Sequence, residues 1–184
     1  MKRSSAWAIG GVTAAFLVIA GMALMYVLNP FHTASRDPRA RLMGAMLYQS
    51  RNDYMAPTIE RGSVFLVDTW AFSRRGPVRG EIVVLVVPQD RVSTVTLRVI
   101  ATGGSTVEMR DGVVYLDGEK LEESYLPSAR SGADQTTMQP IKVPVDSYFV
   151  LGDNRGVSDD SRSWGAVPKD LLVGLVQTLD FAVK

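Results

Sequence analysis

The stretch that decides the fold class reads Thr94-Val-Thr-Leu-Arg-Val-Ile-Ala101, Thr102-Gly-Gly-Ser105, Thr106-Val-Glu-Met-Arg110, Asp111-Gly112 and Val113-Val-Tyr-Leu116. Runs rich in β-branched residues alternate here with short turns. An Asp-Gly pair between such runs is a strong hairpin signal, because both residues tolerate the positive φ angles of a tight turn. We therefore expect a strand at 94–101 and a hairpin over 106–116.

Further short strands are expected on both sides of this stretch. Apolar or β-branched runs occupy residues 63–68, 81–87, 148–151 and 171–183, with Gly or Pro close by. Short strands with turn signals at this spacing are typical of an all-β sandwich or barrel. We expect a mainly β domain over residues 50–184. Within it, residues 122–139 are rich in Ser, Gly, Asp, Thr and Gln, which predicts an exposed loop or a short hairpin.

The N-terminal segment predicts a membrane anchor. Residues 6–28 are uncharged and mostly apolar, and at about 1.5 Å per residue a helix of this length crosses a hydrocarbon core of roughly 30 Å. A cleavable signal peptide is the competing interpretation, but its apolar core would be shorter, and Gly21-Met22-Ala23 is a weak cleavage site. We expect an uncleaved anchor at 6–28, preceded by residues 1–5 and followed by a juxtamembrane segment at 29–49.

Flanking charges leave the orientation of this anchor open. Lys2 and Arg3 favour an N-terminus on the inside, whereas Arg36, Arg39 and Arg41 favour the opposite orientation. Trp7 and Tyr26 lie near the two ends of the run, where amphipathic rings favour the membrane interface.

Composition excludes several classes of function. The 20 basic and 19 acidic residues nearly balance, unlike the basic excess typical of nucleic-acid-binding proteins. The chain has no cysteine and one histidine, His32. Disulfides, thiolate zinc sites, a cysteine nucleophile and a multi-histidine metal site are therefore excluded. We expect no cofactor, no metal and no nucleic-acid partner.

Three segments carry distinctive motifs: Asp53-Tyr-Met-Ala-Pro-Thr-Ile59; Arg79-Gly-Glu-Ile-Val-Val84 followed by Val95-Thr-Leu-Arg-Val-Ile100; and Gly152-Asp-Asn-Arg-Gly-Val-Ser-Asp-Asp-Ser-Arg-Ser-Trp-Gly165. Together they resemble the bacterial type I signal peptidases, the Ser/Lys-dyad leader peptidases of family S26. The first segment is similar to the family's Ser-Met-x-Pro-Thr-Leu box. The next segment is similar to its Gly-Asp-Ile-Val-Val and Tyr-Ile-Lys-Arg-Val-Ile strands. The last segment resembles its Gly-Asp-Asn-Arg-x-x-Ser-x-Asp-Ser-Arg-x-Trp-Gly box, a string that turn chemistry alone would not predict.

This resemblance covers essentially the whole chain and carries several implications. It implies a β-rich domain resting on the outer, periplasmic face of the bacterial inner membrane, a single pass and a cytoplasmic N-terminus. It implies that the partners are the bilayer and the signal peptides of exported proteins. Such a peptide would add as an extended strand beside a strand of the protein, which is recognition by main-chain hydrogen bonds.

Both positions of the catalytic dyad depart from the family pattern. The serine position, directly before Met55, holds Tyr54, and the lysine position, directly before Arg98, holds Leu97. A hydroxyl nucleophile needs an adjacent base, and leucine has no titratable group. Arg98 cannot substitute, because it stays protonated and points to the opposite face of the strand. Asn52 holds the position where the family often has an oxyanion-hole serine.

The remaining box residues are interpreted as structural. Ser158 matches a serine that orients the family lysine, and the acidic and basic members of the last box are expected to brace it by charge-assisted bonds. These positions are Met55, Pro57, Arg98, Gly152, Asp153, Asn154, Arg155, Ser158, Asp160, Ser161 and Arg162.

Three functions compete on this basis. The first is a signal peptidase-like pseudoenzyme that binds peptides or regulates another peptidase or a translocation component. The second is an active serine endopeptidase with a displaced dyad, formed by Ser50 and a distal lysine. The third is a specialised pilin- or conjugation-processing peptidase of the same family, completed by a partner.

Overall fold

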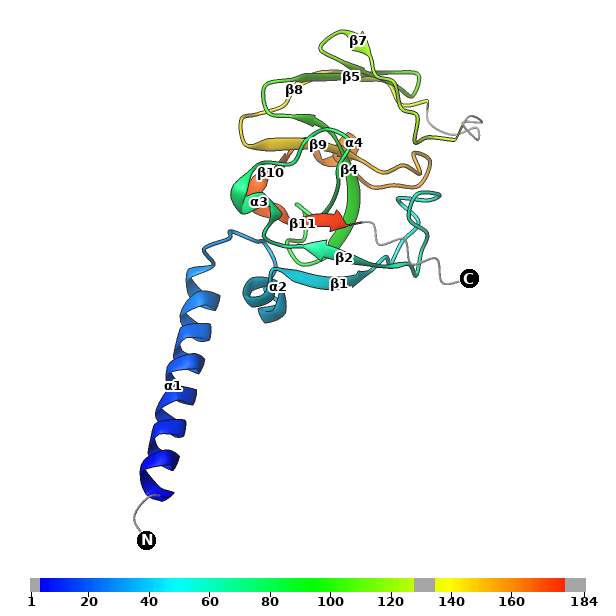
Figure 1. Cartoon of the computed structure of the whole chain (residues 1–184). Helices are drawn as coiled ribbons and strands as arrows, with labels where there is room; N and C mark the ends of the chain where they lie inside the picture. The colour runs from blue at the N-terminus through cyan, green and yellow to red at the C-terminus, as the bar shows by residue number, and fades with distance from the viewer. Residues whose placement is uncertain (1–3, 128–134, 178–184) are drawn as a thin grey trace.

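The computed structural model describes residues 4–127 and 135–177, with side chains from residue 11 onward. A long helix, α1 (Ser4–Leu28), projects from a β-rich body (Figure 1). Its segment Gly11–Leu28 is long and apolar enough to cross a membrane, and none of it is buried against the body. An apolar helix that the described chain leaves unburied, with side-chain contacts to the body at Tyr26, matches the hydrocarbon core of a bilayer in length and chemistry. The expected anchor at 6–28 lies within this helix.

The body contains two antiparallel sheets. The seven-stranded sheet has the order β1-β2-β11-β3-β4-β9-β10 and the four-stranded sheet the order β7-β6-β5-β8. Figure 1 shows the four-stranded sheet at the end of the molecule remote from α1. The strands of the larger sheet are β1 (Ala45–Gln49), β2 (Val64–Asp68), β3 (Ile82–Val86), β4 (Thr94–Thr102), β9 (Ser147–Leu151), β10 (Val167–Pro168) and β11 (Leu172–Gln177); those of the smaller sheet are β5 (Thr106–Arg110), β6 (Val113–Leu116), β7 (Glu119–Lys120) and β8 (Met138–Lys142).

Short helices occupy some of the connections: α2 (Pro38–Met43), α3 (Ala71–Arg74), α4 (Ser161–Trp164) and the 3-10 turn η1 (Lys169–Leu171). Asp37 caps α2 by accepting from the Arg39 N–H at 2.8 Å, and Pro38 starts the helix, where a missing N–H costs nothing. Gly44 ends it with φ 72°, a left-handed conformation that glycine adopts freely.

The mainly β fold is confirmed, with four strands that the sequence analysis did not foresee: β1, β8 and the two-residue strands β7 and β10. β1 lies within the segment 29–49, where it pairs with β2 from Ala45↔Asp68 to Gln49↔Val64. β8 pairs with β5 although it contains Pro140, which is tolerated because β8 is an edge strand. The final strand begins at Leu172, and the expected continuation beyond Gln177 lies outside the described residues.

The core has three parts that meet near the box segments. One cluster contains Leu97 and Val150, a second contains Phe149 beneath the four-stranded sheet, and a third contains Met55 and Phe65. All of these side chains except that of Phe65 are at most 1% exposed. Burying each one contributes roughly 1.5–3 kcal/mol, so these clusters fix the relative positions of the strands.

Candidate functional site

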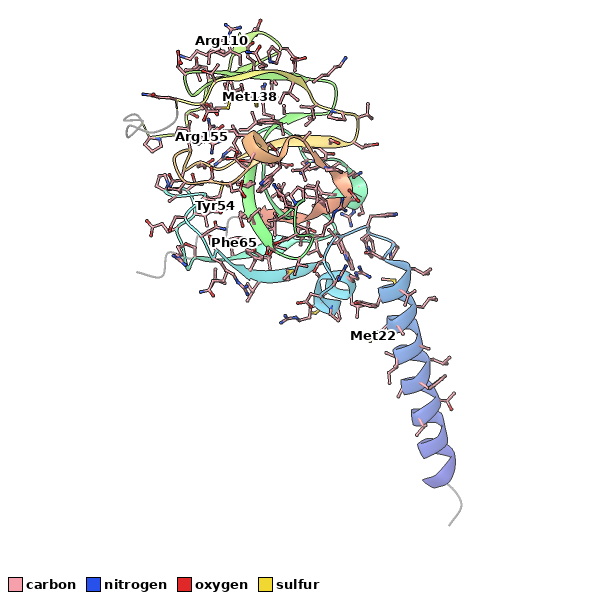
Figure 2. All side chains as sticks on the ribbon, turned by 180° about the vertical axis from the view of Figure 1, so that it is seen from behind. Met22, Tyr54, Phe65, Arg110, Met138 and Arg155 are labelled. Atoms are coloured by element: carbon pink, nitrogen blue, oxygen red, sulfur yellow. The ribbon has the colours of Figure 1, made fainter. Side chains whose placement is uncertain are left out.

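The positions that the resemblance assigns to a serine–lysine dyad share one location. Tyr54 lies in the turn-rich segment between β1 and β2, and its partly buried side chain packs against the first core cluster. Leu97 belongs to that cluster, lies opposite Val83 of β3 and is fully buried. Figure 2 shows Tyr54 on the side of the β body remote from α1. Positions 54 and 97 are therefore brought to the same part of the core.

Neither a lysine nor a histidine occurs on β4 or in the segment between β1 and β2, which carry positions 97 and 54. Among the described residues, the lysines are Lys120 on β7, Lys142 on β8 and Lys169 in η1, so none lies on the strand that carries Leu97. His32 follows the end of α1. The described part of the chain contains no group of three acidic or histidine side chains arranged to hold a metal ion.

The backbone amide of Tyr54 already has a partner. Its N–H donates to Oδ1 of Asn52 at 3.3 Å. Backbone N–H groups are the usual donors of an oxyanion hole, where they must be free to meet the developing charge. An oxyanion that reached this amide would first have to displace the Asn52 side chain, which here presents its acceptor rather than its donor atom.

Ser50, the nearby hydroxyl, is committed to the backbone. It is 3% exposed, and its Oγ donates to the carbonyl of Asn52 at 3.0 Å. Its own N–H donates to Ser63 O, and its carbonyl accepts from the Gly62 N–H. Within the described chain this hydroxyl thus bonds to a carbonyl and not to a base.

Arg98 points away from Leu97, as strand alternation predicts, and enters a buried ion pair. Its Nε and Nη2 donate to Asp153 Oδ1 and Oδ2 at 2.9 and 2.6 Å. Asp153 is 3% exposed and also accepts from the Thr58 hydroxyl at 2.5 Å. The remaining Nη1 donates to Gly80 O at 2.8 Å. This bidentate pair ties β4, the segment of Tyr54 and the loop after β9 together.

Gly152 allows the last box to lie directly on the segment of Tyr54. A Cβ at this position would lie 2.5 Å from Tyr54 O and would also collide with the Cβ of Ser158, so any side chain would push the two segments apart. Asn154 N–H donates to Tyr54 O at 2.9 Å. The Gly152 N–H donates to Asp160 Oδ2 at 3.1 Å.

Asp160 is the centre of the box. It is fully buried, and Arg162 donates to its two carboxylate oxygens from Nε and Nη2 at 2.9 Å each. The Ser158 hydroxyl donates to Oδ2 of Asp160 at 2.7 Å, so this serine has a carboxylate partner in place of a lysine. Ser161, fully buried, accepts from the Val150 N–H at 3.0 Å. These bonds satisfy the buried charge and hold the loop against β9.

The segment that begins the expected loop at 122–139 covers part of this box. Glu123 is paired with Arg155, and both side chains are less than 10% exposed. Tyr125 lies under the Arg98 guanidinium, 4.0 Å from its ring centroid, and its hydroxyl donates to Glu123 at 2.7 Å. Burial, followed by the Glu123 charge, raises the pKa of Tyr125. Glu123 and Tyr125 are therefore packed against Arg155 and Arg98, whereas Glu122, Ser124 and Pro127 are exposed as expected. Residues 128–134 lie outside the described part.

A hydroxyl tie joins the two strands that lead into positions 54 and 97. Tyr48 on β1 lies upstream of Tyr54, and Thr94 begins β4 upstream of Leu97. The Tyr48 hydroxyl lies 2.8 Å from Thr94 Oγ1 and donates to Thr94 O at 3.0 Å. A tyrosine phenol is protonated at neutral pH in any case, and burial raises the pKa of Tyr48 further, so its hydroxyl keeps the proton that it donates.

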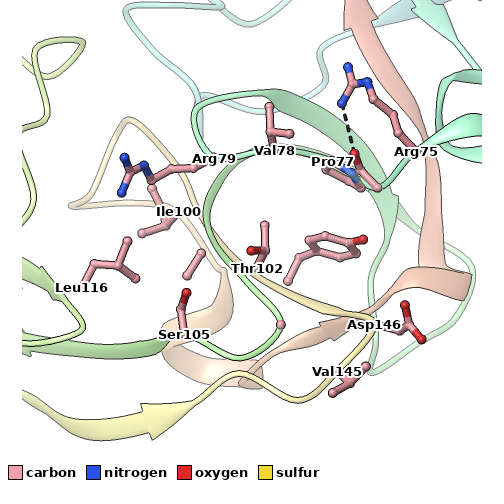
Figure 3. A pocket seen from close by; sticks show the side chains of 14 residues that line it. Arg75, Pro77, Val78, Arg79, Ile100, Thr102, Ser105, Leu116, Val145 and Asp146 are labelled. Atoms are coloured by element: carbon pink, nitrogen blue, oxygen red, sulfur yellow. Dashed lines mark hydrogen bonds between the residues drawn. The ribbon is translucent and has the colours of Figure 1, made fainter.

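The body has surface hollows beside and away from this site. One of about 450 Å³ lies beside Tyr54 and is lined by Asn52, Asn154 and the exposed Arg51 and Arg61, among others. A larger hollow of about 820 Å³ lies between the 75–79 loop, the end of β4 and the 145–146 turn. Figure 3 shows this larger hollow with Arg75 and Asp146 on one side and Arg79 and Leu116 on the other. Neither Tyr54 nor Leu97 lines it.

Comparison with known proteins identifies the family. A family model described as signal peptidase, peptidase S26, matches residues 7–179. The chain belongs to this family.

The signal peptidase I of Leptolyngbya laminosa is 35% identical over 130 residues, which cover 67% of this chain and 62% of that protein. Signal peptidase I T of Bacillus subtilis is 33% identical over 134 residues, or 69% of each chain. A crystal structure of a signal peptidase I from Enterococcus faecalis matches with a TM-score of 0.47 and 33% identity, covering 56% of this chain and 98% of that one. The chain thus spans just under two thirds of the length of its Leptolyngbya relative.

Proposed function

We propose that this member of the signal peptidase I family is a membrane-anchored pseudoenzyme that binds extended peptide segments, such as signal peptides, without cleaving them. The observation that carries the proposal is the shared location of Tyr54 and Leu97 in the first core cluster. A phenol and an aliphatic side chain stand where the family chemistry needs a small hydroxyl and a neutral amine. The phenol oxygen lies several bonds further from the backbone than a serine hydroxyl, and such misplacement is costly in catalysis.

The surroundings of the site support loss of chemistry on a retained scaffold. The Tyr54 amide, which an oxyanion would need as a donor, already donates to the Asn52 side chain. The two buried aspartates, Asp153 and Asp160, keep their arginine partners and hold the box against β4 and β9. These bonds stabilise the shape of the domain and contribute no nucleophile and no base. The most direct explanation is a binding site of family shape that lacks the reactive groups.

The displaced-dyad alternative has less support. Its nucleophile would be Ser50, which is buried and donates to a backbone carbonyl. Its base would be a lysine, and the described lysines lie on β7, β8 and η1, away from the strand that carries position 97. Both a rearranged turn and a relocated lysine would be required before this hydroxyl could act.

Peptide binding is supported by the edge of the larger sheet. β1 pairs with β2 on one side only and leads directly into the segment of Tyr54. An extended peptide gains main-chain hydrogen bonds when it adds to such a strand. The partners in this proposal are signal peptides at the membrane surface and, through them, another peptidase or a translocation component.

The proposal includes a location at the bacterial inner membrane. Residues 1–5 lie in the cytoplasm, residues 6–28 span the bilayer and the β domain lies on the outer, periplasmic face. Because the chain has no cysteine, single cysteines at Ser4 and at the exposed Asp159 report on this directly. In intact cells, a membrane-impermeant maleimide should label Asp159→Cys and leave Ser4→Cys unlabelled until the membrane is opened. The reverse labelling would overturn the orientation.

A binding experiment tests the proposed function. The purified full-length chain in detergent is titrated into a fluorescent signal peptide with small residues before its cleavage point, and anisotropy and peptide mass are both followed. We expect saturable binding with the peptide mass unchanged. A matched control peptide carries prolines along the same segment, which removes the N–H groups needed for strand addition. Shortening of the peptide would overturn the pseudoenzyme, and equal binding of the proline control would overturn strand addition.

A further inference from the structure

The surface hollow of about 450 Å³ beside Tyr54 carries an excess of positive charge. Two exposed arginines, Arg51 and Arg61, line it together with a single acidic residue, Asp53. Within the described part of the chain, none of these three side chains makes a hydrogen bond or an ion pair. The hollow lies on the side of the β body where Figure 2 labels Tyr54. Its two guanidinium groups are therefore available to an anionic ligand.

Two half-buried side-chain amides add neutral hydrogen-bonding groups to the same hollow. Asn52 is fixed by its Oδ1, which accepts from the Tyr54 N–H at 3.3 Å, and its Nδ2 has no partner among the described residues. Asn154 is fixed through its backbone, since its N–H donates to Tyr54 O at 2.9 Å, and its side-chain amide is unpaired in the same part of the chain. Neither amide is sealed in the interior, so a ligand in the hollow can reach both.

The edge strand β1 determines which part of a bound peptide would reach this hollow. β1 is the first strand of the larger sheet and leads through residues 50–53 into Tyr54. In the proposed function an extended peptide adds to the edge of β1 by main-chain hydrogen bonds. A peptide that runs parallel to β1 brings its C-terminal end to Tyr54. The end of the peptide chain then meets the arginines and the amides of the hollow.

A C-terminal carboxylate is the ligand group that matches these side chains. It is ionised at neutral pH, because the pKa of an α-carboxyl group is about 3.5. Guanidinium and amide N–H groups are the donors that carboxylate oxygens accept from, and bonds to a charged acceptor are stronger than bonds to a neutral one. A peptide that continues past this point presents only a neutral carbonyl oxygen, which gains less from the same donors.

We infer that the hollow beside Tyr54 holds the free C-terminal carboxylate of a cleaved peptide, so that this chain binds released signal peptides in preference to intact precursors. Arg51 and Arg61 neutralise the carboxylate, and Asn52 and Asn154 donate to it from Nδ2. The inference rests on the proposed function, whose ligand class it specifies.

A ligand of this kind gives the chain a place after a peptidase in a reaction sequence. Hydrolysis of a peptide bond adds the oxygen of water to the carbonyl carbon and releases the nitrogen as an amine. This step creates the carboxylate that the hollow binds. With Tyr54 and Leu97 at the dyad positions, the proposed function does not include that step in this chain. A separate hydrolase therefore has to produce the ligand.

Three fluorescent peptides of one sequence test the inference by anisotropy titration with the full-length chain in detergent. The first ends in a free carboxylate after a small-x-small segment, the second ends there in a carboxamide, and the third continues past that point as an intact precursor does. We expect the free carboxylate to bind about tenfold tighter than either of the others, the effect of hydrogen bonds to a charged group. The difference should shrink as salt is added, because exposed guanidinium groups are screened.

Substitutions in the hollow should lower the affinity for the free carboxylate to that for the carboxamide. Arg51→Gln combined with Arg61→Gln removes both cations. Asn52→Asp keeps the acceptor for the Tyr54 N–H and replaces the donor Nδ2 by a charged oxygen, which repels the carboxylate. Arg74→Gln on α3, an exposed arginine that does not line the hollow, is the matched control and should keep the preference. Circular dichroism checks that each variant is folded.

The outcomes separate this inference from the proposed function. Equal affinity of the wild-type chain for the carboxylate and the carboxamide would overturn the C-terminal site, while peptide binding itself would stand. Tighter binding of the precursor peptide, or a carboxylate preference that survives both sets of substitutions, would also overturn it. Binding of none of the three peptides would overturn the proposed function and the inference together.

Discussion

Two neighbouring regions of the site differ in the chemistry they contain. Around Tyr54 and Leu97 the side chains are phenolic and aliphatic, and the positions serve packing. Around Asp153 and Asp160 the side chains are ionised, buried and fully engaged with arginines and hydroxyls. The comparison teaches that each buried charge of the polar box needs its partner, because a charge left unpaired in the interior is costly. Under the proposed function, positions 54 and 97 serve packing alone.

The largest effect is expected when the first region is returned to the family pattern. Tyr54→Ser combined with Leu97→Lys should produce cleavage of a preprotein with a small-x-small site, at least about 10²-fold faster than either single change, because nucleophile and base act together. Product formation is measured by mass spectrometry. Tyr54→Ser with Leu97→Met is the matched control without a base. A folded but inactive double variant would mean that the region differs from an active site at more than two positions.

Breaking the second region should cost the most stability. Asp153→Ala removes the partner of the buried Arg98 and should lower the free energy of unfolding by about 3–5 kcal/mol. Denaturant unfolding followed by tryptophan fluorescence in detergent measures the change. Asp159→Ala, at an exposed position of the same box, should stay within about 0.5 kcal/mol of wild type. Similar values for both variants would contradict a structural role for the buried pair.

A smaller effect is expected at the tie between the two strands that enter the site. Tyr48→Phe removes the bond to Thr94, worth about 1 kcal/mol, and should tighten signal-peptide binding by roughly fivefold if a peptide must open this tie. Anisotropy titration measures the affinity. Tyr115→Phe on β6 is the control and should bind as wild type does. Unchanged or weaker binding by the Tyr48 variant would show that the tie does not oppose the peptide.

The smallest effect on stability is expected at the exposed ion pair between Arg75 and Glu81, which serves as the comparison for the buried pair between Arg98 and Asp153. A hydrogen bond from the Arg75 side chain is the main cause that lowers the pKa of Glu81. The contribution of this ion pair to the free energy of unfolding is fully present above the pKa that glutamate has in the unfolded chain. It is lost as the pH falls through the lowered pKa of Glu81 in the folded chain. Glu81→Gln should cost only about 0.2–1 kcal/mol at neutral pH, and the difference from wild type should vanish in acid. A cost approaching that of Asp153→Ala would remove the contrast between exposed and buried pairs.

Much of the fold was predictable from local signals. The Asp111-Gly112 turn and the β-branched runs marked most strands, and the last box marked the family. β1 was missed because residues 29–49 were grouped as one juxtamembrane segment, although only residues 29–44 separate the anchor from this strand. β8 was missed because Pro140 argues against a strand, and only its edge position makes it tolerable.

Some contacts around the candidate site were predictable from the sequence, such as the charge-assisted bond between Asp160 and Arg162, and others were not. Strand alternation correctly placed Arg98 opposite to Leu97. The tie between Tyr48 and Thr94 and the packing of Glu123 and Tyr125 onto the box depend on long-range approach of segments. No periodicity or motif within a single segment encodes those contacts.

The measurement that tests the central claim most directly is intact-mass analysis of a preprotein incubated with the purified wild-type chain. The preprotein carries a small-x-small site, and the Tyr54→Ser, Leu97→Lys variant runs in parallel. The account predicts no product above the buffer rate for wild type. Cleavage by wild type at the expected bond, abolished by Ser50→Ala and unaffected by Tyr54→Ala, would contradict it and assign the activity to a displaced dyad.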